Sequence, residues 1–263
     1  MRTRYLLAIA GIISVAGCQK EPDDSLTNNP SNCTLSKAVY YDPSSGTQAD
    51  TAGFVYSGND VNRVNYTDYY TTLEYSNGKV TKRNFLGHGT TTVSLYDQFS
   101  YNPDNTISKV QSYYMNNGTG IPYYSYDYTY SGGKLQSILE KEDTSTAGTG
   151  TLVNSYNYSY TYTGNNITRV IEEDLIIPGK DTIDFEFDTQ ANYFAKQPSL
   201  FFTDNLFLDL YSAYMPFVLS ANNVTKVIIG AGSSTVTYTE ENQNLKEFRI
   251  NSAVVSRYTY KCQ

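Results

Sequence analysis

The chain has 263 residues, a formal net charge of −7, 27 tyrosines, 11 phenylalanines and no tryptophan. An acidic chain of this kind lacks the clustered Lys and Arg that bind phosphates, so we expect no nucleic-acid partner. Tyr and Phe favour β-strands and the 18 glycines favour tight turns. The composition therefore indicates an all-β protein rather than a disordered chain.

The N-terminus has the layout of a bacterial lipoprotein signal. Two arginines precede an apolar run over residues 5–15, and the small residues Ala16 and Gly17 lead directly to Cys18. The apolar run is shorter than the roughly 20 residues that span a bilayer. We therefore expect residues 1–17 to be a signal peptide that is removed, and Cys18 to carry lipid, including palmitate.

Residues 18–35 are predicted to form a lipidated tether, because they are polar and show no apolar periodicity. Within them, the run Lys-Glu-Pro-Asp-Asp at 20–24 resembles the acidic export signal of Bacteroidetes surface lipoproteins. The resemblance implies an outer-membrane protein that is lipid-anchored and exposed on the cell surface. An ordinary acidic linker on a periplasm-facing lipoprotein is the alternative. Removing the signal peptide takes away two basic residues and no acidic ones, which leaves a formal charge of −9.

Two further cysteines, Cys33 and Cys262, lie near the two ends of the mature chain. The oxidising environment outside the cytoplasm allows such a pair to form a disulfide. A bridge across so long a loop stabilises a fold by roughly 5 kcal/mol at most in the chain-entropy model. Two unpaired thiols are the alternative.

A short phrase recurs through residues 36–263, which we expect to form a single β-repeat domain. Each copy has an aromatic residue, any residue and usually Tyr, then a turn rich in Gly and Asn, then two apolar residues three positions apart. The copies lie at residues 54–64, 73–82, 99–110, 128–138 and 160–170, with weaker copies at 219–227 and 236–248 and half a copy at 258–262.

Each copy predicts a β-hairpin. Aromatic residues two apart point to one face of a strand, and the turn residues tolerate the positive φ of tight hairpins. Apolar residues three apart, such as Val61 and Val64, would face opposite sides of a regular strand. Either a bulge separates them or the first residue belongs to the turn. The alternation of tyrosines is longest in two ladders: Tyr124, Tyr126, Tyr128 and Tyr130, and Tyr156, Tyr158, Tyr160 and Tyr162.

The hairpins together predict an antiparallel up-and-down meander of roughly a dozen strands, which should curl into a strongly twisted sheet or partial barrel with tyrosines inside. One end should carry tight turns, and the other end longer connections at 87–92, 116–120 and 143–150. Residues 189–218 break the repeat. They are predicted to form a short helical or apolar plug, and a partner-binding flap is the alternative. The helical spacing involves Leu206, Leu210 and Tyr214, after a possible cap at Asp204.

Few residues suggest catalysis. The one histidine, His88, lies between two glycines without a nearby nucleophile motif. The carboxylates of residues 172–174 and of Asp184, Glu186 and Asp188 could supply a glycosidase pair or a calcium site. However, the last three alternate with phenylalanines, which is typical of a strand with one solvated face. We therefore expect no catalytic residues, no metal site and no cofactor.

The repeats resemble the tyrosine-aspartate (YD) repeats of Rhs-type proteins. Gly78-Lys79 and Gly133-Lys134 keep the glycine-basic turn of that family, whereas the Asp that follows the tyrosine is replaced in this chain. Together with Cys18, they make the chain similar to Bacteroidetes-type lipoproteins of unknown function that are built from YD-like hairpins. The resemblance implies a β-repeat fold and brings no catalytic residues.

The sequence thus predicts a lipoprotein of the outer membrane that acts as a non-catalytic binding or scaffolding module. Its expected partners are the membrane, through the lipid on Cys18, and either an envelope protein or a glycan. The alternative function is a carboxylate-dependent glycan hydrolase that uses Asp184 or Glu186.

Overall fold

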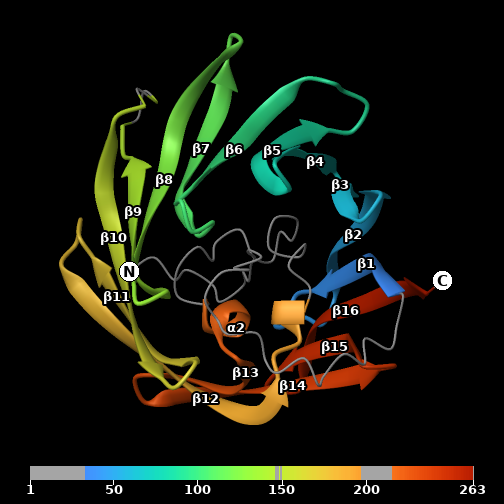
Figure 1. Ribbon diagram of the computed structural model, residues 1–263, viewed down its shortest axis with the longest axis vertical. Helices are drawn as coiled ribbons and strands as arrows, with labels where there is room; N and C mark the ends of the chain where they lie inside the picture. The colour runs from blue at the N-terminus through green and yellow to red at the C-terminus, as the bar shows by residue number, and fades with distance from the viewer. Residues whose placement is uncertain (1–32, 146–147, 149, 197–214, 263) are drawn as a thin grey trace.

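The computed structural model describes residues 33–145, 148, 150–196 and 215–262, and their strands form one closed barrel (Figure 1). Sixteen strands pair antiparallel with their neighbours in the chain, and the last strand pairs with the first. The all-β meander is therefore confirmed. The expected dozen strands and partial barrel are corrected to sixteen strands and full closure, which leaves no exposed sheet edge.

The strands are β1 (Cys33–Tyr41), β2 (Gln48–Ser57), β3 (Asp60–Asn65), β4 (Tyr69–Ser76), β5 (Lys79–Gly87), β6 (Val93–Tyr101), β7 (Ile107–Asn116), β8 (Thr119–Ser131), β9 (Lys134–Asp143), β10 (Leu152–Thr163), β11 (Asn166–Asp174), β12 (Gly179–Ala191), β13 (Asn222–Ile229), β14 (Gly232–Glu241), β15 (Asn244–Ile250) and β16 (Ala253–Cys262). The described helical elements are the 3-10 turn η2 (Phe194–Lys196) and the short helix α2 (Pro216–Leu219).

The inner wall of the barrel is its hydrophobic core. The alternating tyrosines of β8 and β10 face inward, as predicted, and pack with the aliphatic residues of the neighbouring strands. Tyr124 stacks near Tyr126, and Tyr156 near Tyr158, with ring centroids 6.3 and 6.1 Å apart. Burying an aliphatic or aromatic side chain of this size stabilises a fold by about 1.5–3 kcal/mol.

A bulge separates the paired apolar residues of each hairpin, which confirms one of the two predicted explanations. In the β2–β3 hairpin, Val55 faces Arg63 but Tyr56 faces Val61, so Asn62 is the extra residue. The same register shift occurs in the β4–β5, β6–β7, β8–β9, β10–β11 and β14–β15 hairpins. The bulge turns both apolar residues toward the core.

Hydrogen bonds from tyrosines link successive hairpins. The hydroxyl of Tyr75 donates to the carbonyl of Val61, and that of Tyr101 donates to the carbonyl of Val80, over 2.7 and 2.6 Å. Each acceptor precedes the extra residue of a bulge, in the hairpin before the tyrosine. Tyr56 makes the equivalent bond to Leu35. These bonds satisfy carbonyls that face the core, where an unpaired polar group is costly.

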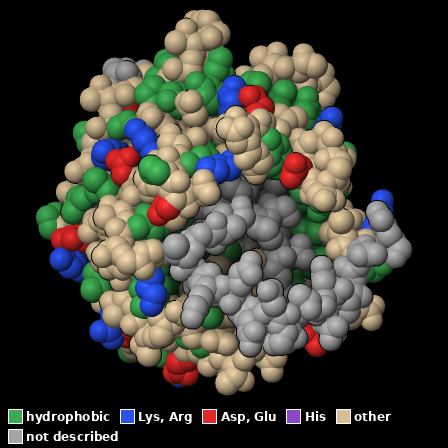
Figure 2. All heavy atoms as spheres, in the orientation of Figure 1, with side chains coloured by type: hydrophobic (Ala, Val, Ile, Leu, Met, Phe, Trp, Pro, Cys, Tyr) green, Lys and Arg blue, Asp and Glu red, His purple; other side chains and the backbone are tan. Residues whose placement is uncertain are grey.

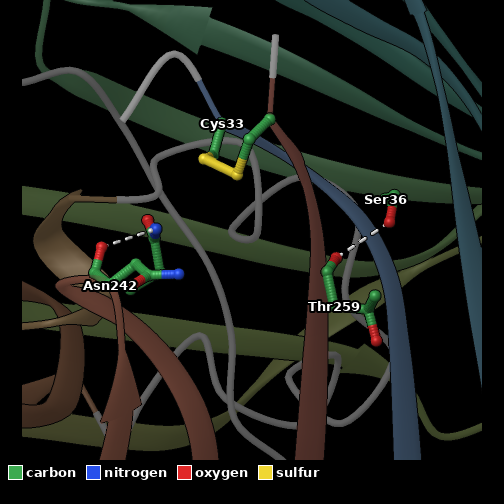
Figure 3. The surroundings of a disulfide bond; sticks show 6 residues. Cys33, Ser36, Asn242 and Thr259 are labelled. Atoms are coloured by element: carbon green, nitrogen blue, oxygen red, sulfur yellow. Dashed lines mark hydrogen bonds between the residues drawn. A yellow bond between two sulfur atoms is a disulfide. The ribbon is translucent and has the colours of Figure 1, made fainter. Parts of the chain in front are cut away.

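The seam between β16 and β1 repeats the hairpin geometry although no turn joins the two strands. Leu35 faces Tyr260 and Lys37 faces Thr259, so Ser36 is the extra residue of a bulge. Its hydroxyl donates to the carbonyl of Thr259 over 2.9 Å (Figure 3). The extra residues of two other bulges donate in the same way: Thr81 to Glu74 and Thr168 to Thr161. The first strand therefore supplies the missing half of the last repeat.

A disulfide between Cys33 and Cys262 closes this seam (Figure 3). The two cysteines face each other two positions beyond the Leu35–Tyr260 pair. In the β2–β3 hairpin, the corresponding positions are the two turn residues, Gly58 and Asn59. The covalent bond thus stands where other hairpins have a peptide turn. Because β1 begins at Cys33, residues 33–35 belong to the barrel and not to the tether.

We call the end of the barrel that holds this bond the disulfide end, and the opposite end the loop end. Tight turns at 58–59, 77–78, 132–133 and 164–165 lie at the disulfide end, as predicted. The loop end carries the longer connections at 88–92 and 144–151. However, the expected long connection at 116–120 is a two-residue turn, because Asn117 and Gly118 adopt positive φ.

The longest connection begins at residue 192 and ends at residue 221, both at the disulfide end, where only tight turns were expected. Its described parts pack inward: Phe194, Met215 and Phe217 are each at most 2% exposed. The ring of Phe217 meets those of Phe185 and Phe248 edge-on, at 6.2 and 5.8 Å. The predicted helix around Leu206, Leu210 and Tyr214, with its cap at Asp204, lies outside the described residues.

Candidate functional site

The outer wall of the barrel is polar and charged. Residues between the inward tyrosines, such as Asp127 on β8 and Ser159 on β10, face outward. Charged side chains occur around the visible rim (Figure 2). Ion pairs join neighbouring strands on many sides of the barrel: Glu74–Lys82, Asp127–Lys141, Arg169–Asp184, Glu173–Lys180, Glu186–Lys226 and Glu247–Arg257.

Two of the three candidate carboxylates on β12, Asp184 and Glu186, belong to this outer wall. Asp184 accepts two hydrogen bonds from Arg169, over 2.6 and 3.0 Å, and Glu186 accepts one from Lys226 over 2.8 Å. The bond from Arg169 lowers the pKa of Asp184 and keeps it ionised. Asp188 accepts from the side chain of Asn223 over 3.2 Å. A glycosidase needs one of its two carboxyl groups to act as an acid, and Asp184, which is held ionised beside Arg169, does not supply one.

The acidic run on β11 is divided between the two faces. Glu173 faces outward and pairs with Lys180 over 2.9 Å. Asp174 ends the strand, and its Oδ1 accepts from the backbone N–H groups of Ile176 and Ile177. The run therefore does not converge on one point. Among the described residues, no three His, Cys, Asp or Glu side chains are arranged to hold a metal ion.

His88 lies in the β5–β6 connection at the loop end. Its Nε2 atom is 2.8 Å from the carbonyl oxygen of Tyr66, and its ring is tilted at 6.3 Å from that of Tyr70. Both partners hold the imidazole against the connection between β3 and β4. These contacts do not form the nucleophile–base–carboxylate arrangement of a catalytic triad.

A buried polar cluster on the inner wall was not predicted from the sequence. Arg83 on β5 donates from Nε and Nη2 to Oδ2 of Asp97 on β6, over 2.8 and 2.5 Å, and both side chains are at most 5% exposed. Ser112 on β7 donates to Oδ1 of the same carboxylate over 2.6 Å. Burial raises the pKa of nearby Tyr123 to about 12. With both oxygens of Asp97 occupied, the cluster ties three strands together and offers no free base.

One sequence signal could have revealed this cluster. Arg83 follows Val80 by three residues, so it takes the place that Val64 takes in the preceding hairpin. Asp97 alternates with Phe99 in the inward phase of its strand. A charged residue in an apolar phase on each of two adjacent strands indicates a buried ion pair.

Cys18, the predicted lipid attachment site, lies outside the described residues. Within the described ranges, no helix has the length and apolar character needed to cross a bilayer.

No protein-family model matches the sequence, and no curated protein is significantly similar to it. The fold is similar to two solved structures. One is a porin-like protein from Bacteroides uniformis ATCC 8492, with a TM-score of 0.50 and 13% identity, covering 86% of this chain and 96% of that one. The other is a porin-like protein from Bacteroides vulgatus ATCC 8482, with a TM-score of 0.52 and 11% identity, covering 87% and 98%. The chain thus shares its barrel fold with porin-like proteins of Bacteroides.

Proposed function

We propose that the protein is a lipoprotein of the outer membrane whose barrel stands in water and serves as a non-catalytic binding or scaffolding module of the cell envelope. Lipid on Cys18 is its attachment to the membrane, and the acidic run at 20–24 directs it to the cell surface. The porin-like names of the two similar structures support an envelope location. The fold itself, however, does not decide how the barrel meets the membrane.

The single observation that carries the proposal is the polarity of the two walls. Barrels that span the outer membrane have an apolar outer band about 25 Å tall and a polar interior. Here the inner wall is apolar and the outer wall carries cross-strand ion pairs such as Arg169–Asp184 and Glu186–Lys226. A Lys or Arg facing lipid near the bilayer midplane costs about 2–4 kcal/mol, so this outer wall favours water.

The topology supports one orientation on the membrane. β1 begins at the disulfide end, so the tether that precedes Cys33 leaves from that end. The disulfide end then faces the membrane and the loop end points away from it. Residues 192–196 and 215–221, the described parts of the β12–β13 connection, contribute to a plug at the membrane-facing end, which the burial of Phe194 and Phe217 supports.

The absence of catalysis is part of the proposal. Asp184 and Glu186, the residues of the alternative hydrolase, hold outward ion pairs with Arg169 and Lys226. Turnover of a polysaccharide that disappears in Asp184→Asn or Glu186→Gln would overturn the non-catalytic assignment. Turnover that both variants retain would exclude these residues as its source.

The attachment is tested by comparing the full-length protein with a Cys18→Ala variant in the native host. We expect labelled palmitate in the first protein only, and accessibility of the first protein to protease added to whole cells. Equal membrane association of the unlabelled variant would contradict the lipid anchor. Protection from protease until the outer membrane is opened would restrict the protein to the periplasmic side.

A further inference from the structure

Most of the exposed large apolar side chains gather at one corner of the loop end. Val153 is the second residue of β10, and Leu175, Ile176 and Ile177 lie in the connection between β11 and β12. They are 41%, 40%, 46% and 73% exposed, and among the described residues only Val55, on β2, is similarly exposed. We call these four residues the apolar corner. A cluster of exposed apolar side chains is typical of an interaction site.

The apolar corner is held in a fixed shape. The N–H of Leu175 donates to the carbonyl of Ser155 over 2.8 Å, which holds the connection against β10 close to Val153. The Oδ1 atom of Asp174 accepts from the N–H groups of Ile176 and Ile177, both over 2.8 Å. A surface already in its bound shape loses less conformational entropy when it binds.

Carboxylates surround the corner. Glu142 faces Val153 across the β9–β10 pair, and Asp143 faces Leu152. Glu173, Asp174 and Asp181 lie on the two strands that flank the connection. The nearby cations, Lys180 and Lys141, are paired with Glu173 and Asp127. We call Glu142, Asp143, Glu173, Asp174 and Asp181 the acidic rim.

We propose that the apolar corner docks a protein partner that offers an apolar pocket bordered by Lys and Arg. This inference rests on the proposed function, because it names the partner class of the binding module. The acidic rim opposes two other occupants: a second copy would bring like charges together, and an anionic lipid surface would repel the rim. The corner also lies at the end opposite Cys33, away from the anchor.

The test is site-specific photocrosslinking of the full-length protein in its native cells. A photoreactive amino acid replaces Ile177, and the matched control carries it in place of Val55, which is 42% exposed on β2. We expect an envelope protein to be captured from position 177 and not from position 55, through a peptide containing Lys or Arg. Capture should fall by about tenfold when Ile176→Ser removes apolar contact area, and also when added salt screens the rim.

Four results would overturn the inference: equal capture from both positions, capture of lipid, capture of a second copy, or no specific capture from position 177. Membrane fractionation of the same cells shows whether the docking inference alone fails or the proposed function fails as well. If the barrel is anchored through Cys18 but gives no specific capture, only the proposed docking surface is rejected. If the barrel is found without lipid in the soluble fraction, the proposed function itself is rejected.

Discussion

Cys33 lies opposite Cys262 at the position that the two-residue turn occupies in the β2–β3 hairpin. The disulfide joins residues 229 positions apart and fastens the one strand pair that no peptide connection holds. The half repeat at 258–262 and the strand that begins at Cys33 thus form one complete hairpin from the two ends of the chain. The strand pair that closes the barrel therefore has the same register and the same bulge as the β2–β3 hairpin.

We expect a Cys33→Ser, Cys262→Ser double variant to keep the barrel but to lose up to about 5 kcal/mol in the free energy of unfolding, since the open chain gains conformational entropy when it unfolds. Urea unfolding of the purified protein measures the loss. Cys18→Ser is the matched control and should unfold at the wild-type urea concentration. Equal stability of the double variant and the control would show that the seam holds without its covalent bond.

The hydrogen bond from Tyr75 to the carbonyl of Val61 predicts a second effect. Tyr75→Phe should destabilise the fold by about 1–3 kcal/mol, because the carbonyl stays buried without its donor. Tyr113→Phe, on the outer wall, should cost less. Thermal unfolding followed by circular dichroism compares the two variants. A larger loss for Tyr113→Phe would contradict the role given to the inward tyrosines.

The buried pair of Arg83 and Asp97 predicts a non-additive pattern. Asp97→Asn should cost about 3–5 kcal/mol, because Arg83 keeps a buried charge without its carboxylate. Replacing both residues, with Arg83→Met and Asp97→Leu, should cost less than the single change. In the exposed pair, Arg169→Gln should cost less than about 1 kcal/mol. Additive losses in urea unfolding would argue against a coupled buried pair.

The buried tyrosines predict a limit to stability at high pH. Burial raises the pKa of Tyr75, Tyr123 and Tyr162 to about 12 each, from an ordinary value of 10.0. A group with a raised pKa in the folded state contributes stability that is complete below the unfolded pKa and is lost as pH rises through the folded pKa. The free energy of unfolding should therefore fall between pH 10 and 12.

Phenolate absorbance measures this titration. Folded protein should ionise part of its tyrosines only near pH 12, whereas protein in concentrated urea should ionise all of them near pH 10. Identical curves for the two states would contradict the burial of these side chains.

The local structure was predictable because it depends on neighbours in the sequence. The alternation around Tyr126 and Tyr158 indicates inward rings, and the spacing of Val61 and Val64 indicates either a bulge or a longer turn. The register shift at Asn62 settles that choice. Closure of the barrel was harder to predict, since it depends on pairing between residues 33–40 and 256–262. No local pattern in the sequence indicates that these two segments pair.

The placement of the candidate carboxylates was predictable from the sequence. The alternation of Asp184 and Glu186 with Phe185 indicates a solvated face, and both carboxylates lie there in ion pairs. Periodicity marks Arg83 and Asp97 as inward residues, but their pairing depends on the register of β5 against β6. The exposed corner around Ile177 depends on the path of a connection and does not follow from periodicity.

The most direct test of the account is to place a specific protease site within residues 19–32 of the full-length protein and to cleave it in isolated outer membranes. A barrel that stands in water on a lipid tether is predicted to appear in the supernatant, folded, as soon as the tether is cut. A barrel that remains with the membrane until detergent dissolves the bilayer would contradict the account, because its outer wall would then contact lipid.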